Sequence, residues 1–72
     1  MKDQHLVQMA NSIGDFFVAM PDGRQAREDL VAHIRRFWEP RMRRGIYEHI
    51  DRSGGEGLQP IVLEALQAHR RP

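Results

Sequence analysis

The sequence predicts an all-α protein, a small bundle of three to four short helices in one domain covering residues 1–72. Two observations favour this class. Apolar residues recur at the i, i+3, i+4 and i+7 spacing of a helix face, and no segment alternates as a half-buried strand would. Groups of proline and glycine separate the periodic segments, as expected for short antiparallel helices.

The first helix is expected over about residues 3–20. Asp3 is the expected N-cap, because its carboxylate can accept hydrogen bonds from the free amides of the first turn. The turn residues Pro21, Asp22 and Gly23 end the helix. Its predicted apolar stripe comprises Leu6, Met9, Ala10, Ile13, Phe16, Phe17 and Met20.

The second helix is expected over about residues 24–38. It must stop near Trp38, because Pro40 disfavours the α conformation at Glu39. Phe37 and Trp38 are expected to fill the corner that follows. The whole predicted buried face comprises Ala26, Leu30, Val31, Ile34, Phe37 and Trp38.

Two further helices are expected, over about 40–51 and 59–68. Pro40 suits the first position of a helix, where its missing N–H costs nothing. The glycine-rich stretch 53–57 is a loop, and His69 to Pro72 are expected to fray. The inward positions are Met42, Ile46, His49 and Ile50 in one helix, and Ile61, Val62, Leu63 and Leu66 in the other.

Size and charge point to a partner. A chain of 72 residues without cysteine has neither disulfides nor thiolate metal sites to stabilise a small core. The formal net charge is only +1, but residues 24–44 hold seven arginines against three acidic residues. No stretch has the roughly 20 apolar residues of a membrane span, and no targeting signal is evident, so a cytoplasmic location is expected.

Candidate catalytic residues are few. Ser12 and Ser53 are the only serines, and neither lies in a nucleophile-elbow motif. There is no phosphate-binding loop or dinucleotide fingerprint. The four histidines lack the i, i+3 or i, i+4 spacing that places two metal ligands on one helix face. We therefore expect no catalytic, cofactor or metal site, with His33 and His49 partly buried and hydrogen-bonded.

The segment 33–44 is the most informative part of the chain. It concentrates five arginines and the only tryptophan around Pro40. Arginine and tryptophan are enriched at interface hot spots, and a guanidinium fork suits partner carboxylates. The predicted partner-binding residues are Arg35, Arg36, Trp38, Glu39, Arg41, Met42, Arg43 and Arg44.

Nucleic-acid binding is the alternative hypothesis, since two short helices joined by a tight turn loosely match a helix-turn-helix. Several features count against it. The pI of about 8.4 is below the range above about 9 that is typical of a nucleic-acid footprint. Asn, Gln, Ser and Thr, which read bases and phosphates, are missing from residues 40–50.

The run Phe37-Trp38-Glu39-Pro40-Arg41-Met42-Arg43, preceded by His33-Ile34-Arg35, resembles the hallmark segment of the delta subunit of NAD-linked molybdenum formate dehydrogenases. The blocks 9–17 and 57–66 resemble the terminal helices of that family, so the resemblance covers most of the chain. Glu39 stands where aspartate is expected, which weakens side-chain capping of the third helix.

The resemblance implies a small accessory subunit without an active site or cofactor of its own. Its partners would be the larger subunits of a cytoplasmic complex that oxidises formate and reduces NAD, with the molybdenum-bearing alpha subunit as the expected contact. It further implies a role in assembly, cofactor maturation or stability. In isolation, so small a bundle is expected to expose apolar residues through which it can self-associate.

Overall fold

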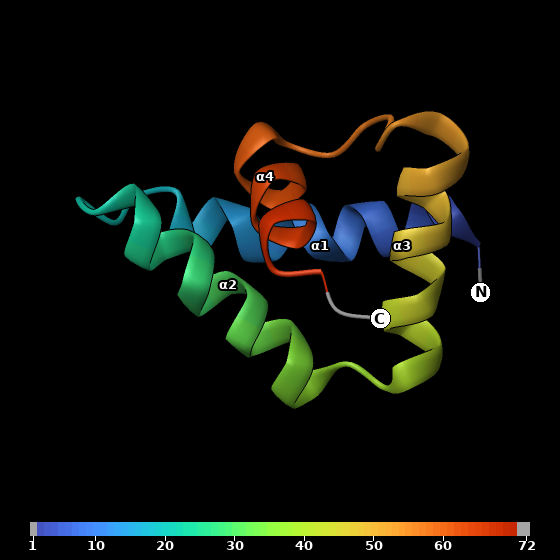
Figure 1. The fold of residues 1–72 in the computed structure, drawn as a ribbon, viewed down its shortest axis with the longest axis horizontal. Helices are drawn as coiled ribbons and strands as arrows, with labels where there is room; N and C mark the ends of the chain where they lie inside the picture. The colour runs from blue at the N-terminus through green and yellow to red at the C-terminus, as the bar shows by residue number, and fades with distance from the viewer. Residues whose placement is uncertain (1, 71–72) are drawn as a thin grey trace.

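Four helices follow one another in the computed structural model, which describes residues 2–70 (Figure 1). They are α1 (Asp3–Phe17), α2 (Gly23–Phe37), α3 (Pro40–Ser53) and α4 (Pro60–Ala68). In Figure 1, α1 runs across the back, α2 and α3 form two arms joined at the bottom, and α4 lies end-on between them. The predicted all-α class is confirmed.

The first helix ends three residues earlier than predicted. Its last residue is Phe17, and Met20 N–H donates to the carbonyl of Phe17 at 3.1 Å, which closes a tight turn. Pro21 explains the early end, because it moves Met20 away from the α region. Asp22 then caps α2, with its carboxylate accepting from the amides of Arg24 and Gln25 at 3.0 and 3.2 Å.

The third helix runs to Ser53, two residues beyond the predicted end. Gly54 follows it with φ of 74°, and its N–H donates to the carbonyl of Ile50 at 2.8 Å. This is a left-handed C-cap, which glycine adopts without a steric penalty. Pro40 is the first residue of α3 as predicted, and Glu39 makes no side-chain cap hydrogen bond.

The buried core joins all four helices, and most predicted inward positions contribute to it. The buried hydrophobic residues are Leu6, Val7, Ala10, Ala26, Leu30, Val31, Ile34, Trp38, Ile46, Ile50, Val62, Ala65 and Leu66. Phe16 and Phe37 were predicted to be buried and are instead 73% and 64% exposed. Each precedes an inward residue, Phe17 or Trp38, and a one-residue step moves the side chain about 100° around a helix.

Gly14 explains how α4 comes so near α1. A Cβ at this position would lie 2.6 Å from Oε1 of Gln59 and 2.7 Å from Cγ2 of Val62. Only glycine therefore allows α4 its present distance. The atoms that approach Gly14 most closely are side-chain atoms.

Asn11 fixes the glycine-rich loop to α1. Its amide donates to the carbonyl of Gly57, and its side-chain oxygen accepts from the amide of Gln59, both at 2.9 Å. The carboxylate of Asp15 accepts from the Gln59 side chain at 2.6 Å. Three polar contacts thus set the path of the chain into α4.

The described end of the chain is fastened, contrary to the expectation that it frays. The carbonyl of His69 accepts from Arg35 at 2.6 Å, and Arg70 binds Asp51 through two hydrogen bonds of 2.6 and 2.7 Å. That expectation also covered residues 71 and 72, which lie outside the described part of the chain.

Candidate interaction surface

The predicted partner-binding residues lie together at the basic corner, which we define as residues 35–44. This segment comprises the end of α2, the turn and the first residues of α3. Arg35, Arg36, Glu39, Arg41 and Arg44 are exposed, and Met42 and Arg43 are partly buried. The corner therefore presents a strongly positive surface, as the sequence suggested.

Trp38 occupies the inside of the corner. Trp38 is 6% exposed, and its side chain belongs to the hydrophobic core. Its backbone N–H donates to the carbonyl of Ile34 at 2.9 Å. Trp38 therefore fills the corner as predicted, whereas Phe37 does not. Trp38 therefore has little surface that a partner could touch.

A cleft of about 750 Å³ opens beside the corner between α2, α3 and α4. We call it the basic cleft, because four arginines line it against two acidic residues. Its apolar lining comes from core residues and Pro40. The lining residues are Val31, Ile34, Arg35, Pro40, Arg43, Arg44, Tyr47, Glu48, Asp51, Leu66 and Arg70.

Three of the cleft arginines hold its walls together. Arg43 donates to the carbonyl of Arg35 at 2.9 Å, which satisfies an acceptor in the last turn of α2. Arg35 in turn donates to His69 after α4. Arg70 binds Asp51, and its hydrogen bonds hold the pKa of that carboxyl below its usual value. These guanidinium groups keep further N–H donors for a ligand.

Tyr47 lies in the same cleft, under Arg70. The guanidinium carbon of Arg70 is 4.9 Å from the centroid of the Tyr47 ring, in a cation–π contact. The Tyr47 hydroxyl donates a long hydrogen bond of 3.4 Å to the carbonyl of Leu66. Burial raises the pKa of Tyr47, so its hydroxyl keeps its proton and stays a donor.

Two arginines of the corner differ from the others. Arg35 and Arg43 donate to backbone carbonyls, and Arg36 lies over the ring of Phe37. Among residues 2–70, the guanidinium groups of Arg41 and Arg44 make no hydrogen bond, ion pair or cation–π contact. Their guanidinium groups are exposed at the start of α3. They are therefore available to bind carboxylates in bidentate fashion.

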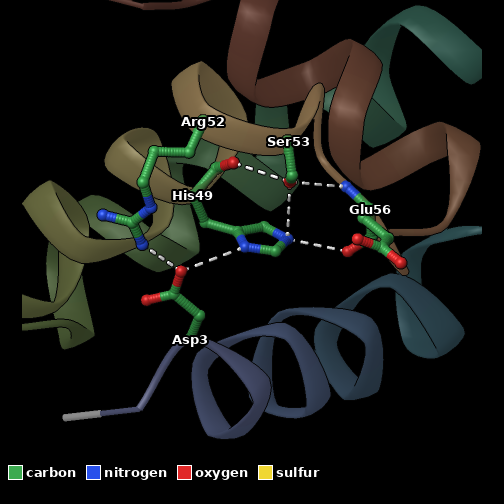
Figure 2. Close-up of polar contacts among 5 residues, drawn as sticks. All are labelled: Asp3, His49, Arg52, Ser53 and Glu56. Atoms are coloured by element: carbon green, nitrogen blue, oxygen red, sulfur yellow. Dashed lines mark hydrogen bonds and ion pairs between the residues drawn. The ribbon is translucent and has the colours of Figure 1, made fainter.

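A second polar cluster lies at the opposite end of α3, beside α1, and was not foreseen from the sequence (Figure 2). Nδ1 of His49 is 3.2 Å from Oδ2 of Asp3, and Nε2 is 2.7 Å from the carbonyl oxygen of Glu56. Arg52 also binds Asp3. Asp3 thus links α1 to α3. The sequence predicted Asp3 as the N-cap of α1, and this prediction is wrong: Asp3 is the first residue of the helix, and the N-cap is Lys2, without a side-chain cap hydrogen bond.

Ser53 adds a serine–histidine–aspartate sequence of contacts, with its Oγ 3.4 Å from Nε2 of His49. The proton positions do not suit a nucleophile. Nε2 faces a carbonyl oxygen, which can only accept, so it must donate its N–H there. Ser53 donates to the carbonyl of His49 at 2.8 Å and accepts from the amide of Glu56 at 3.1 Å. The cluster therefore fastens the end of α3 and offers Ser53 no free base.

Two histidines, His33 and His49, were predicted to be partly buried and hydrogen-bonded. His49 is partly buried and hydrogen-bonded, as predicted. His33 is partly buried, but its neighbours are the rings of Phe17 and Phe37, with centroids at 6.1 and 4.7 Å.

Within residues 2–70, no three His, Asp or Glu side chains are grouped to hold a metal ion. None of the helices in that range has the length and apolar character needed to cross a bilayer.

A family model of the NADH-dependent formate dehydrogenase delta subunit, FdsD, matches residues 5–66. No curated protein and no solved structure matches the chain. The matched range contains the basic corner and most of all four helices. The chain therefore belongs to the family of delta subunits of NADH-dependent formate dehydrogenases.

Proposed function

We propose that this protein is a non-catalytic accessory subunit that binds the larger subunits of a cytoplasmic, molybdenum-containing formate dehydrogenase. The family supports membership of such a complex. We further propose that binding supports assembly, cofactor maturation or stability, and that the molybdenum-bearing alpha subunit is the principal contact. A protein of this kind acts by stabilising the conformation of the partner that it binds.

The observation that carries the proposal is the pair of unengaged arginines, Arg41 and Arg44, beside the basic cleft. Elsewhere in the cleft, hydrogen bonds within the chain use part of each guanidinium group. Arg41 and Arg44 have no such contact within residues 2–70. Their partner would be an acidic surface of a larger subunit.

The test is a pull-down of the tagged chain from the cytoplasm of its native cells. The eluate is assayed for formate-dependent reduction of NAD, and the purified chain is assayed alone. We expect the activity to co-elute with the larger subunits and the purified chain to have none. An eluate without that activity, or one rich in nucleic acid, contradicts the proposal, and the second result supports the helix-turn-helix alternative.

A matched pair of variants sharpens this test. Arg41→Ser combined with Arg44→Ser should reduce the recovered activity. Arg24→Ser removes an exposed arginine outside the corner, one that only forms a surface pair with Glu28 at 3.7 Å, and should leave recovery unchanged. Equal losses in both variants would show that the corner has no special part in binding.

A further inference from the structure

The exposed apolar side chains of this protein are gathered rather than scattered. Among residues 2–70 the large hydrophobic residues that are exposed are Phe16, Val18 and Phe37, at 73%, 59% and 64%. Two lie at the end of α1 and one at the end of α2. Single exposed apolar residues are normal on a soluble protein, whereas a contiguous group marks an interaction site.

Ring contacts join Phe16 and Phe37 through two further side chains into one row, which we call the aromatic ridge. It consists of Phe16, Phe17, His33 and Phe37. The centroids of Phe16 and Phe17 are 5.0 Å apart, those of Phe17 and His33 are 6.1 Å apart, and those of His33 and Phe37 are 4.7 Å apart. The ridge thus crosses from α1 to α2, and the ring contacts fix its side chains before any partner binds.

The ridge is continuous with the basic corner. The guanidinium carbon of Arg36 lies 5.6 Å from the centroid of the Phe37 ring, within reach of a cation–π contact. An aromatic row that ends in exposed arginines has the composition of an interface centre. The two features together form one candidate surface with an apolar part and a positive part.

A second copy of this chain is a poor occupant for that surface. In a two-fold pair the same patch lies on both sides of the interface. When the two ridges of such a pair run in the same direction, the exposed arginines at the Phe37 end meet those of the other copy, and like charges at an interface are unfavourable. A partner with carboxylates beside an apolar groove neutralises the same arginines.

We infer that the aromatic ridge inserts into an apolar groove of a larger subunit of the dehydrogenase, and that carboxylates at one end of this groove bind Arg36 and the neighbouring arginines. This inference rests on the proposed function and names the surface and the chemistry of the partner.

The larger subunits are prepared without this chain and immobilised on a surface. The purified chain is then titrated over them, and its dissociation constant is measured. The ridge variant combines Phe16→Ser and Phe37→Ser, and a conservative variant combines Phe16→Leu and Phe37→Leu. Gln67→Ser, at an exposed position of α4, is the control. We expect the ridge variant to bind at least about tenfold more weakly, the leucine variant to lose less, and the control to match the wild type.

The outcomes separate this inference from the proposed function. If the wild type itself does not bind the larger subunits, the proposed function fails. If the wild type binds and the ridge variant binds equally well, the ridge inference alone is overturned. Sedimentation of the isolated chain tests whether a second copy occupies the ridge. If the wild type is a dimer, the ridge variant is a monomer, and both bind the larger subunits equally well, the ridge binds a second copy and the inference is overturned. Helical circular dichroism and an unchanged melting curve verify the fold of each variant.

Discussion

Asp3, in the first turn of α1, and His49, in α3, approach to 3.2 Å between carboxylate Oδ2 and imidazole Nδ1. They are 46 residues apart in the sequence. Nε2 of the same ring faces the carbonyl of Glu56 at 2.7 Å, so His49 connects Asp3 to the loop after α3. Arg52 also binds Asp3. One carboxylate thus fastens the beginning of the chain to the end of α3.

Asp3→Asn should lower stability near neutral pH, and this loss should disappear in acid. The hydrogen bond from Arg52, followed by that from His49, lowers the pKa of Asp3. The folded state therefore binds fewer protons at this site than the unfolded state. The resulting stability is complete above the ordinary carboxyl pKa of about 3.9 and is lost as pH falls through the folded value. Urea midpoints measured from neutral to strongly acid pH test this.

The control for Asp3 is Glu64→Gln, which also removes one carboxylate but at an exposed position of α4. This variant should follow the wild-type midpoint over the same pH range. A loss in Asp3→Asn that stays constant into strong acid would attribute the effect to packing rather than to the carboxylate charge.

Gly14→Ala should destabilise the protein although alanine is the better helix former. The helix preference favours alanine by about 1 kcal/mol. Against this, the new Cβ would lie 2.6 and 2.7 Å from Gln59 and Val62, and forcing a packed contact apart costs roughly 1–3 kcal/mol. We expect a net loss in the free energy of unfolding, measured by chemical denaturation.

Gly23→Ala is the matched control, because Gly23 begins α2 and the nearest atom to a Cβ there is the end of the Arg27 side chain at 3.3 Å. A flexible, partly exposed side chain can move away. This variant should be neutral or more stable by up to about 1 kcal/mol. Stabilisation by both alanines would show that α4 has room to move away from α1.

The sequence predicts the helices well because helix periodicity and turn residues are local properties. Pro40, the glycine loop and the buried faces of α2, α3 and α4 all follow from residues within a few positions of one another. The early end of α1 is also a local effect, because Pro21 disfavours the α conformation at Met20. Asp22 likewise carried an N-cap signal that was interpreted only as a turn.

Contacts between distant residues could not be predicted in the same way. Periodicity places Phe16 and Phe17, or Phe37 and Trp38, near one face without deciding which of the two enters the core. Asp3 has the right residue type for an N-cap, and only the position of α3 reveals its bonds to His49 and Arg52. The exposure of the corner arginines followed from charge alone, whereas the aromatic ridge depends on how α1 and α2 pack.

Arg70→Ala should loosen the end of α4 more than the rest of the protein. Arg70 binds Asp51 through two hydrogen bonds and covers the ring of Tyr47. Amide hydrogen exchange should become faster in the last turn of α4 and stay unchanged in α1. Arg70→Lys keeps the charge but loses the two-donor fork, so it should restore protection only in part. Uniformly faster exchange in all helices would contradict a local role.

Trp38→Ala and the arginine variants of the corner should weaken binding for different reasons. Trp38 is 6% exposed in the core, and truncating a buried tryptophan costs roughly 3–5 kcal/mol. A domain of this size has a total stability of roughly 4–11 kcal/mol. A small core without disulfides belongs at the low end of that range. There the variant should be largely unfolded in isolation, with reduced helical circular dichroism, and Trp38→Phe should recover much of the signal.

Arg41→Ala and Arg44→Ala should instead change the free energy of unfolding by no more than about 0.5 kcal/mol, because both side chains are exposed and unengaged among the described residues. Their binding to the larger subunits should weaken. Raising the salt concentration should weaken binding of the wild type more steeply than binding of the variants.

Excess large subunit should partly refold Trp38→Ala by mass action, while the helicity of the arginine variants should not change. Trp38→Ala that is folded alone yet fails to bind would place Trp38 in the contact itself and would require the corner to open on binding.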